Sequence, residues 1–154
     1  MMITDASFTG KYMCVPAQFQ DASCFEQAFP GSNSVSVNIP QYEMLLFYES
    51  NGEELRHIFE ILLTKLSCIK DYNKLLISCK DNHTFAVLAT GEQLLLVNSF
   101  STGDSVSILY YLLLALQQSQ VNPQQTIVHC LGFREHIDVK LIRTYFKDFV
   151  FMES

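Results

Sequence analysis

The segment KLLISCKDNHTFAVLATGEQLLLVNSF, residues 74–100, decides the fold of this chain. Residues 74–80 largely alternate between apolar and polar side chains, and the apolar runs 84–90 and 93–100 follow after short turns. Alternation with a period of two is typical of a strand, and links this short can join only neighbouring antiparallel strands. The sequence therefore predicts a three-stranded antiparallel meander.

An unusually apolar helix is predicted directly after the meander. The run from Val106 to Leu116 is interrupted only by Ser107, and Asp104 or Ser105 can cap its start. The run is too short to cross a bilayer, so the sequence predicts no membrane span. Because it is apolar nearly all round, we expect the helix to be buried on more than one side, either inside the fold or between two subunits.

The rest of the C-terminal part alternates between strand and helix patterns. The strand after the long helix should pair in parallel with the meander, because a helical crossover separates the two, and Gly132 ends that strand. The elements expected are a strand over 126–131, a helix over 135–147 and an edge strand over 149–152.

The N-terminal part begins with a polar lead-in over 1–10 that we expect to be flexible. Asn51, with Glu54 three residues later, has the spacing of a capping box and predicts the start of an amphipathic helix that runs to Leu66. The other elements expected are strands over 11–15, 35–39 and 44–48 and a helix over 17–29.

The composition limits the classes of function. The 154 residues include 10 basic and 16 acidic side chains, a net charge of −6, without a cluster of Lys or Arg. An acidic surface repels phosphates, so we expect no nucleic-acid partner. Only 17% of the residues are charged and 49% are hydrophobic, which leaves uncharged surface for contact with another protein.

The five cysteines indicate a reducing compartment and no metal site. Their number is odd, and no two lie two to four residues apart, which argues against a disulfide framework and against zinc ligation. Cys79 and Cys130 lie within apolar runs, where a thiol behaves as a small hydrophobe. The first residues lack a basic stretch followed by an apolar one, so no signal peptide is predicted. We therefore expect a cytoplasmic protein.

The order of the elements and several short motifs resemble known proteins. The motifs are Asn98-Ser99-Phe100, Tyr110-Tyr111-Leu112, Asn122-Pro123, Leu131-Gly132 and Tyr145. They resemble an uncharacterised bacterial family of unknown function with an actin-like ATPase fold, and a meander followed by helix, strand, helix and strand is similar to a ribonuclease-H-like domain. The resemblance implies an α/β mixed sheet, with a partial first subdomain of strand–helix–strand–helix over 11–70 and a ribonuclease-H-like second subdomain over 73–154.

The same resemblance implies a nucleotide cleft with Asp81, Asn82 and Gly132 as candidate residues for ATP and Mg²⁺. In actin-like ATPases, a turn between two strands grips phosphate with an acid followed two residues later by glycine, so that backbone amides can approach. The matching turn, Asp81-Asn82-His83-Thr84, has the acid but lacks the glycine. Actin-like ATPases also have a pair of glycines after the fourth strand, on the side of the cleft that binds adenosine. Here the segment Cys130-Leu131-Gly132-Phe133 has one glycine, Gly132. These departures argue against tight phosphate contact.

The sequence predicts no catalytic residue and leaves two functions open. A ribonuclease-H-type nuclease needs carboxylates on its first helix and fourth strand, and residues 105–120 and 126–131 contain none. We favour a non-catalytic interaction or scaffold module that binds another protein, or a second copy of itself, through the helix around Tyr110 and Tyr111. The alternative is ATP binding or ATPase activity as part of a longer chain or a dimer.

Overall fold

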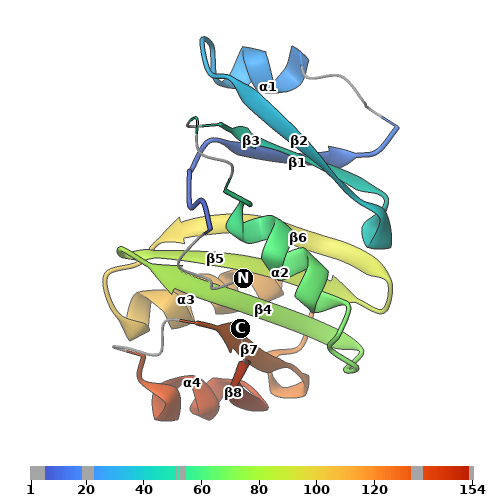
Figure 1. The fold of residues 1–154 in the computed structure, drawn as a ribbon. Helices are drawn as coiled ribbons and strands as arrows, with labels where there is room; N and C mark the ends of the chain where they lie inside the picture. Colours follow the sequence, from blue (N-terminus) through green and yellow to red (C-terminus); the bar gives the residue numbers. More distant parts are fainter. Residues whose placement is uncertain (1–5, 19–22, 51, 53–54, 133–136, 153–154) are drawn as a thin grey trace.

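The computed structural model describes residues 6–18, 23–50, 52, 55–132 and 137–152, which form a mixed α/β fold with two sheets (Figure 1). One sheet has three strands and the other has five. The three-stranded sheet lies beyond the β6 edge of the five-stranded sheet (Figure 1). Within the described part of the chain, no helix combines the length and the apolar character needed to cross a lipid bilayer.

The five-stranded sheet contains the predicted meander. Its strand order is β6-β5-β4-β7-β8. The strands are β4 (Asn73–Lys80), β5 (His83–Thr90), β6 (Gln93–Ser101), β7 (Ile127–Leu131) and β8 (Asp148–Met152). β4, β5 and β6 pair antiparallel, whereas β7 pairs in parallel with β4 and β8 in parallel with β7. The predicted meander and the parallel pairing after the crossover are both confirmed.

The three-stranded sheet is antiparallel, in the order β1-β3-β2. Its most apolar strand, β3, lies in the middle, where both edges are paired. Phe25 of the short helix beside this sheet is fully buried, and its ring lies 6.5 Å from that of Phe47. The elements of this part are β1 (Tyr12–Pro16), α1 (Ser23–Ala28), β2 (Ser34–Ile39), the 3-10 helix η2 (Pro40–Tyr42) and β3 (Met44–Glu49).

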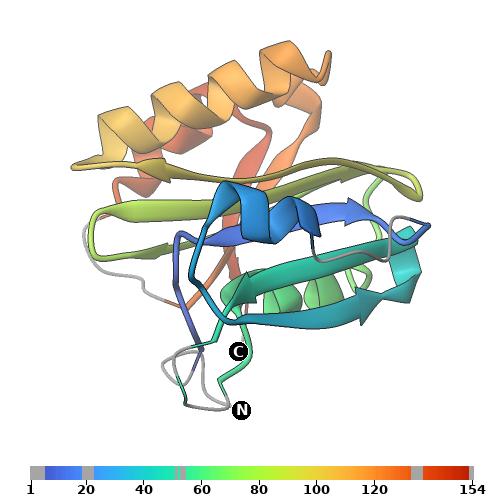
Figure 2. The ribbon, with the colours of Figure 1, turned by 90° about the horizontal axis from the view of Figure 1, so that it is seen from above.

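Helices cover both faces of the five-stranded sheet. α2 (Ile58–Leu66) lies on one side, and α3 (Ser105–Gln118) and α4 (Val139–Tyr145) lie on the other (Figure 2). The alternation along β4 explains the two cores: Leu76 packs with α2, whereas Leu75 and Ile77 pack with α3 and α4. The 3-10 helix η3 (Pro123–Gln125) connects the end of α3 to β7.

The core on the α2 side extends into the three-stranded sheet. Leu46 and Tyr48 of β3 belong to the same buried cluster as α2 and β4. Ala6, within the predicted lead-in 1–10, is 5% exposed and belongs to it as well. This core therefore draws on both of the predicted subdomains, 11–70 and 73–154, and the division of the chain at that point stays a prediction.

Two predicted helices begin later than expected. Residues 17 and 18 form a turn, so the start predicted at residue 17 is wrong, and the described helix α1 runs from Ser23, while residues 19–22 lie outside the described residues. α2 begins at Ile58 with His57 as its N-cap, so the prediction of a start at Asn51 is wrong. The backbone N–H of Ser7 donates to the carbonyl of Arg56, and Ser7 and His57 form a parallel β-bridge. These contacts hold the chain just before α2 in an extended conformation beside the segment around Ser7. Asn51 and Glu54, the predicted capping box, lie outside the described residues.

The last helix is also shorter than predicted. α4 begins at Val139, because the Asp138 carboxylate accepts a hydrogen bond from the N–H of Leu141 and caps the helix there. Ile142 is the buried residue of this helix, whereas Tyr145 is 47% exposed. Part of the predicted start, residues 135 and 136, lies outside the described residues.

The long helix α3 has the predicted cap but only one buried face. The Asp104 carboxylate accepts from the N–H of Ser107 at 2.8 Å, which confirms the cap. Leu109 and Leu112 pack against the sheet, but Val106 is 64% exposed and Tyr110 is 59% exposed. Burial on more than one side within the fold was therefore a wrong expectation. Burial of the outer face between two subunits stays a prediction.

Candidate functional site

The predicted site residues lie at one edge of the five-stranded sheet. β4 and β7 are parallel neighbours, with Ile77 opposite Cys130. Because parallel strands end at the same edge, the turn of Asp81 and Asn82 after β4 and Gly132 after β7 emerge side by side. The structure thus brings the three residues to one edge, and their role in binding stays a prediction.

Asp81 and Asn82 form a tight two-residue turn. Lys80 pairs with His83 across it, and both central residues have positive φ, 51° for Asp81 and 62° for Asn82. These values indicate a type I′ hairpin turn, which Asp and Asn tolerate because their short side chains accept the left-handed conformation. The missing glycine therefore does not prevent the turn, but three exposed side chains occupy residues 81–83.

The loop between β6 and α3 is tied to this turn. The N–H of Thr102 donates to the carbonyl of Asn82 at 2.8 Å, and the hydroxyls of Thr84 and Thr102 lie 2.9 Å apart in a buried contact. Asp104 follows on the same loop, where hydrogen bonds from Ser107 hold the pKa of its carboxyl below the ordinary value. Two exposed carboxylates, of Asp81 and Asp104, thus flank this edge.

Two thiols lie just inside the same edge. Cys79 of β4 and Cys130 of β7 belong to the same core cluster on the α3 side of the sheet, and Cys130 Sγ donates to the carbonyl of Gly132 at 3.8 Å. The Cys130 side chain lowers the pKa of the Cys79 thiol, against the opposing effect of burial. The sequence showed both cysteines only as small hydrophobes. The predicted parallel pairing of their strands was the one signal that could have brought them together.

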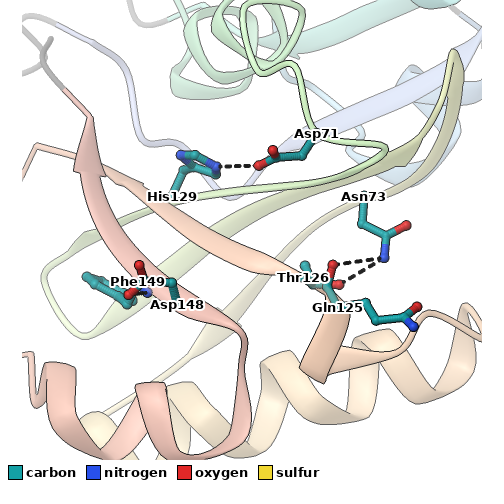
Figure 3. A network of polar contacts seen from close by, with 7 residues as sticks. All are labelled: Asp71, Asn73, Gln125, Thr126, His129, Asp148 and Phe149. Atoms are coloured by element: carbon teal, nitrogen blue, oxygen red, sulfur yellow. Dashed lines mark hydrogen bonds and ion pairs between the residues drawn. The ribbon is translucent and has the colours of Figure 1, made fainter.

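A second polar network lies near the start of β4 and β7 (Figure 3). His129 Nε2 and Asp71 Oδ2 are 3.4 Å apart, and the two side chains point toward each other (Figure 3). Asn73 donates through Nδ2 to the Thr126 hydroxyl at 3.2 Å. These contacts fix the segment before β4 against β7. Among the described residues, no group of three or more His, Cys, Asp or Glu side chains could hold a metal ion.

Comparison with known proteins identifies a family and a fold. The model of a family described as "Protein of unknown function (DUF3822)" matches residues 10–149. No curated protein matches the sequence. A crystal structure from Bacteroides thetaiotaomicron, of a protein with actin-like ATPase fold and unknown function, aligns with a TM-score of 0.71 at 14% identity. The alignment covers 94% of this chain and 65% of the other, so this chain spans about two thirds of that protein's length.

Proposed function

The chain belongs to the DUF3822 family of unknown function and has an actin-like ATPase fold, and from this premise we propose that it is a non-catalytic interaction or scaffold module. The observation that carries the proposal is the exposed outer face of α3. Val106 and Tyr110 are one helical turn apart and expose 64% and 59% of their surface. Large apolar side chains gathered on one exposed face favour contact with another protein.

Tyr110 is held by an aromatic stack. Its ring meets the edge of Tyr111 at 5.2 Å between centroids, and Tyr111 lies flat on Phe100 of β6, at 5.0 Å and an interplanar angle of 12°. The exposed ring is thus supported from beneath by the sheet. Restricted aromatic side chains lose little conformational entropy on binding, and they dominate the energy of many protein interfaces.

The turn of Asp81 and Asn82 supports a non-catalytic role. A carboxylate at the site of a phosphate repels it unless a metal ion lies between them. The nearest lysine, Lys80, has its Nζ 4.5 Å from the centroid of the Phe8 ring, where it makes a cation–π contact. The turn therefore places a carboxylate and other side chains at the position where a phosphate-binding turn offers backbone N–H groups.

Sedimentation velocity over a range of concentrations tests contact between copies of the chain. Tyr110→Ser should weaken self-association at least tenfold, whereas Tyr72→Ser should leave it unchanged, because Tyr72 is 73% exposed but lies before β4. If the chain stays monomeric, cross-linking to a different protein replaces sedimentation as the assay, and the same two variants are compared in it. Equal behaviour of both variants in both assays contradicts the proposal, as does a rise of several degrees in melting temperature with saturating Mg-ATP.

The alternative function is ATP binding by a longer chain or a dimer. It is favoured by the placement of Asp81, Asn82 and Gly132 at one sheet edge. If it holds, calorimetric titration with Mg-ATP should show binding that Asp81→Ala weakens about tenfold through loss of a carboxylate that orders Mg²⁺. Glu92→Ala is the matched control, since Glu92 is exposed in the β5–β6 turn at the opposite edge. Absence of any binding heat for the longer chain rejects this alternative.

A further inference from the structure

β2 forms an open edge of the three-stranded sheet. β3 pairs with one side of β2, and no other strand in the described part of the chain pairs with its opposite side. The N–H of Ser50 donates to the carbonyl of Asn33, which fixes the alternation of hydrogen bonds along the two strands. By that alternation, the backbone N–H and C=O groups of Ser34, Ser36 and Asn38 point away from β3. A row of outward-pointing groups like this is a template for another strand.

β2 lacks the features that usually protect an exposed edge strand. Natural edges carry charged side chains, an internal proline or a β-bulge, each of which prevents a further strand from pairing. Residues 30–42 contain no charged side chain, Pro40 comes only after the strand has ended, and the register with β3 is continuous. Ser36 is exposed, whereas Ile39 is 2% exposed and anchors the strand in the core. β2 is thus fixed by one face and accessible along its outer edge.

We propose that β2 pairs antiparallel with β2 of a second copy of this chain, so that the two three-stranded sheets become one. A two-fold axis at Ser36 places this residue opposite its own copy, and Ser34 opposite Asn38 of the partner subunit. All three residues have outward-pointing backbone groups, so the edge is complementary to itself in this register. The pairing does not involve the exposed face of α3, which lies on the opposite side of the molecule from β2 (Figure 2).

The side chains and the charge of this segment favour a second copy over a different partner. In the proposed register Val35 lies opposite Val37 of the partner subunit, and such pairs of β-branched residues stabilise antiparallel strands. Val35 is 37% exposed in the single chain, so the pairing covers apolar surface. The net charge of −6 opposes self-association, but residues 30–42 contain no charge and can approach their own copy without local repulsion.

Residue-resolved hydrogen exchange on the full chain at two protein concentrations tests the proposal. The amides of Ser34, Ser36 and Asn38 should exchange about tenfold more slowly at about 1 mM than at about 10 μM, because association follows mass action. The amides of Val35 and Val37, which point toward β3, should be protected equally at both concentrations. Equal exchange of all five amides at both concentrations would overturn the proposal, as would protection of the outer three that requires a different protein.

Two substitutions of Ser36 form a matched pair. Ser36→Pro removes an outward N–H and keeps the bonds to β3, so it should abolish the concentration-dependent protection of Ser34 and Asn38. Ser36→Ala keeps that N–H and should retain the protection. If Ser36→Pro does not fold, Ser36→Lys places like charges opposite each other at the two-fold axis, and it should weaken pairing about tenfold in low salt and less in high salt. The same protection in all three variants would contradict pairing centred on Ser36.

Tyr110→Ser separates this contact from that of α3. The substitution should leave the protection of Ser34, Ser36 and Asn38 unchanged, because β2 and α3 lie on opposite sides of the molecule (Figure 2). Persistence of the protection would support pairing through β2 even if sedimentation shows no role for Tyr110. Loss of the protection in Tyr110→Ser would refute a separate contact through β2.

Discussion

His57 is a buried, neutral residue that contacts the N-terminal segment at Thr9, helix α2 at Phe59 and strand β3 at Tyr48. Its Nδ1 accepts a hydrogen bond from the N–H of Phe59 at 3.1 Å, so its Nε2 carries the proton and donates to the carbonyl of Thr9 at 2.9 Å. The ring stacks on Phe59 and also lies against Tyr48. Burial lowers the pKa of His57 from 6.5 to about 4, because the cationic form would lose its hydration.

The first prediction is that His57 makes folding stability depend on pH between about 4 and 6.5. The unfolded chain takes up a proton at His57 below about pH 6.5, while the folded chain resists until about pH 4. The contribution is therefore complete above pH 6.5 and is lost as the pH falls, by about 3 kcal/mol at pH 4. Urea unfolding at a series of pH values measures this slope.

A variant without a titrating ring is the control for this slope. His57→Asn keeps an oxygen that can cap α2, and it should flatten the dependence of the free energy of unfolding on pH over that window. His83→Asn should keep the dependence of the unmodified chain, because His83 is exposed. An unchanged slope in His57→Asn would show that other groups cause the acid destabilisation.

Residue-level contacts were predictable only where they are local. Asp104 was predicted, with Ser105, as a possible cap because the two residues come just before the apolar run that begins at Val106, and the contact with Ser107 spans three residues. His57 was missed because its role depends on Thr9, from a segment 48 residues away. The placement of Cys79 and Cys130 in one core cluster depends on the register of β4 and β7, which no local pattern specifies.

At the scale of elements, α2 is the helix that most depends on its packing. Ile58, Phe59, Leu62, Leu63 and Leu66 are fully buried in a helix of nine residues. A helix this short is marginal in isolation, so tertiary contacts supply its stability. The sequence predicted this apolar face correctly, because a period of 3.6 is visible in the residues themselves. It placed the start wrongly, because the strand-like pairing of residue 7 with residue 57 is a long-range contact.

The second prediction concerns the packing of α2. Leu62→Ala should lower the free energy of unfolding by about 2–5 kcal/mol, because it removes buried methyl groups and leaves a cavity between α2 and the sheets. Thr64→Ala, on the exposed side of the same helix, should change it by less than about 0.5 kcal/mol. Urea unfolding compares the two variants. A loss of similar size in both would contradict the prediction that burial of the apolar face stabilises α2.

At the scale of the whole molecule, the five-stranded sheet separates two cores, and one of these continues into the three-stranded sheet. The order of elements in the larger sheet was predictable, because short turns force neighbouring antiparallel strands and a helical crossover favours a parallel one. The placement of the three-stranded sheet was not, because it depends on contacts such as that of Tyr12 with Ser99, whose hydroxyls are 2.8 Å apart. Local periodicity carries no information about such pairs.

The third prediction is that the hydroxyl of Tyr12 couples the two sheets energetically. Tyr12 of β1 lies 2.8 Å from the hydroxyl of Ser99 and 3.3 Å from Asn98 Oδ1, both on β6, and burial raises its pKa although the bond to Ser99 opposes this. Tyr12→Phe and Ser99→Ala should each lower the free energy of unfolding by about 0.5–1.5 kcal/mol. The double variant should lose less than their sum, because both remove the same hydrogen bond. Strictly additive losses would show that Tyr12 and Ser99 do not stabilise the fold through a shared hydrogen bond, and would contradict the prediction.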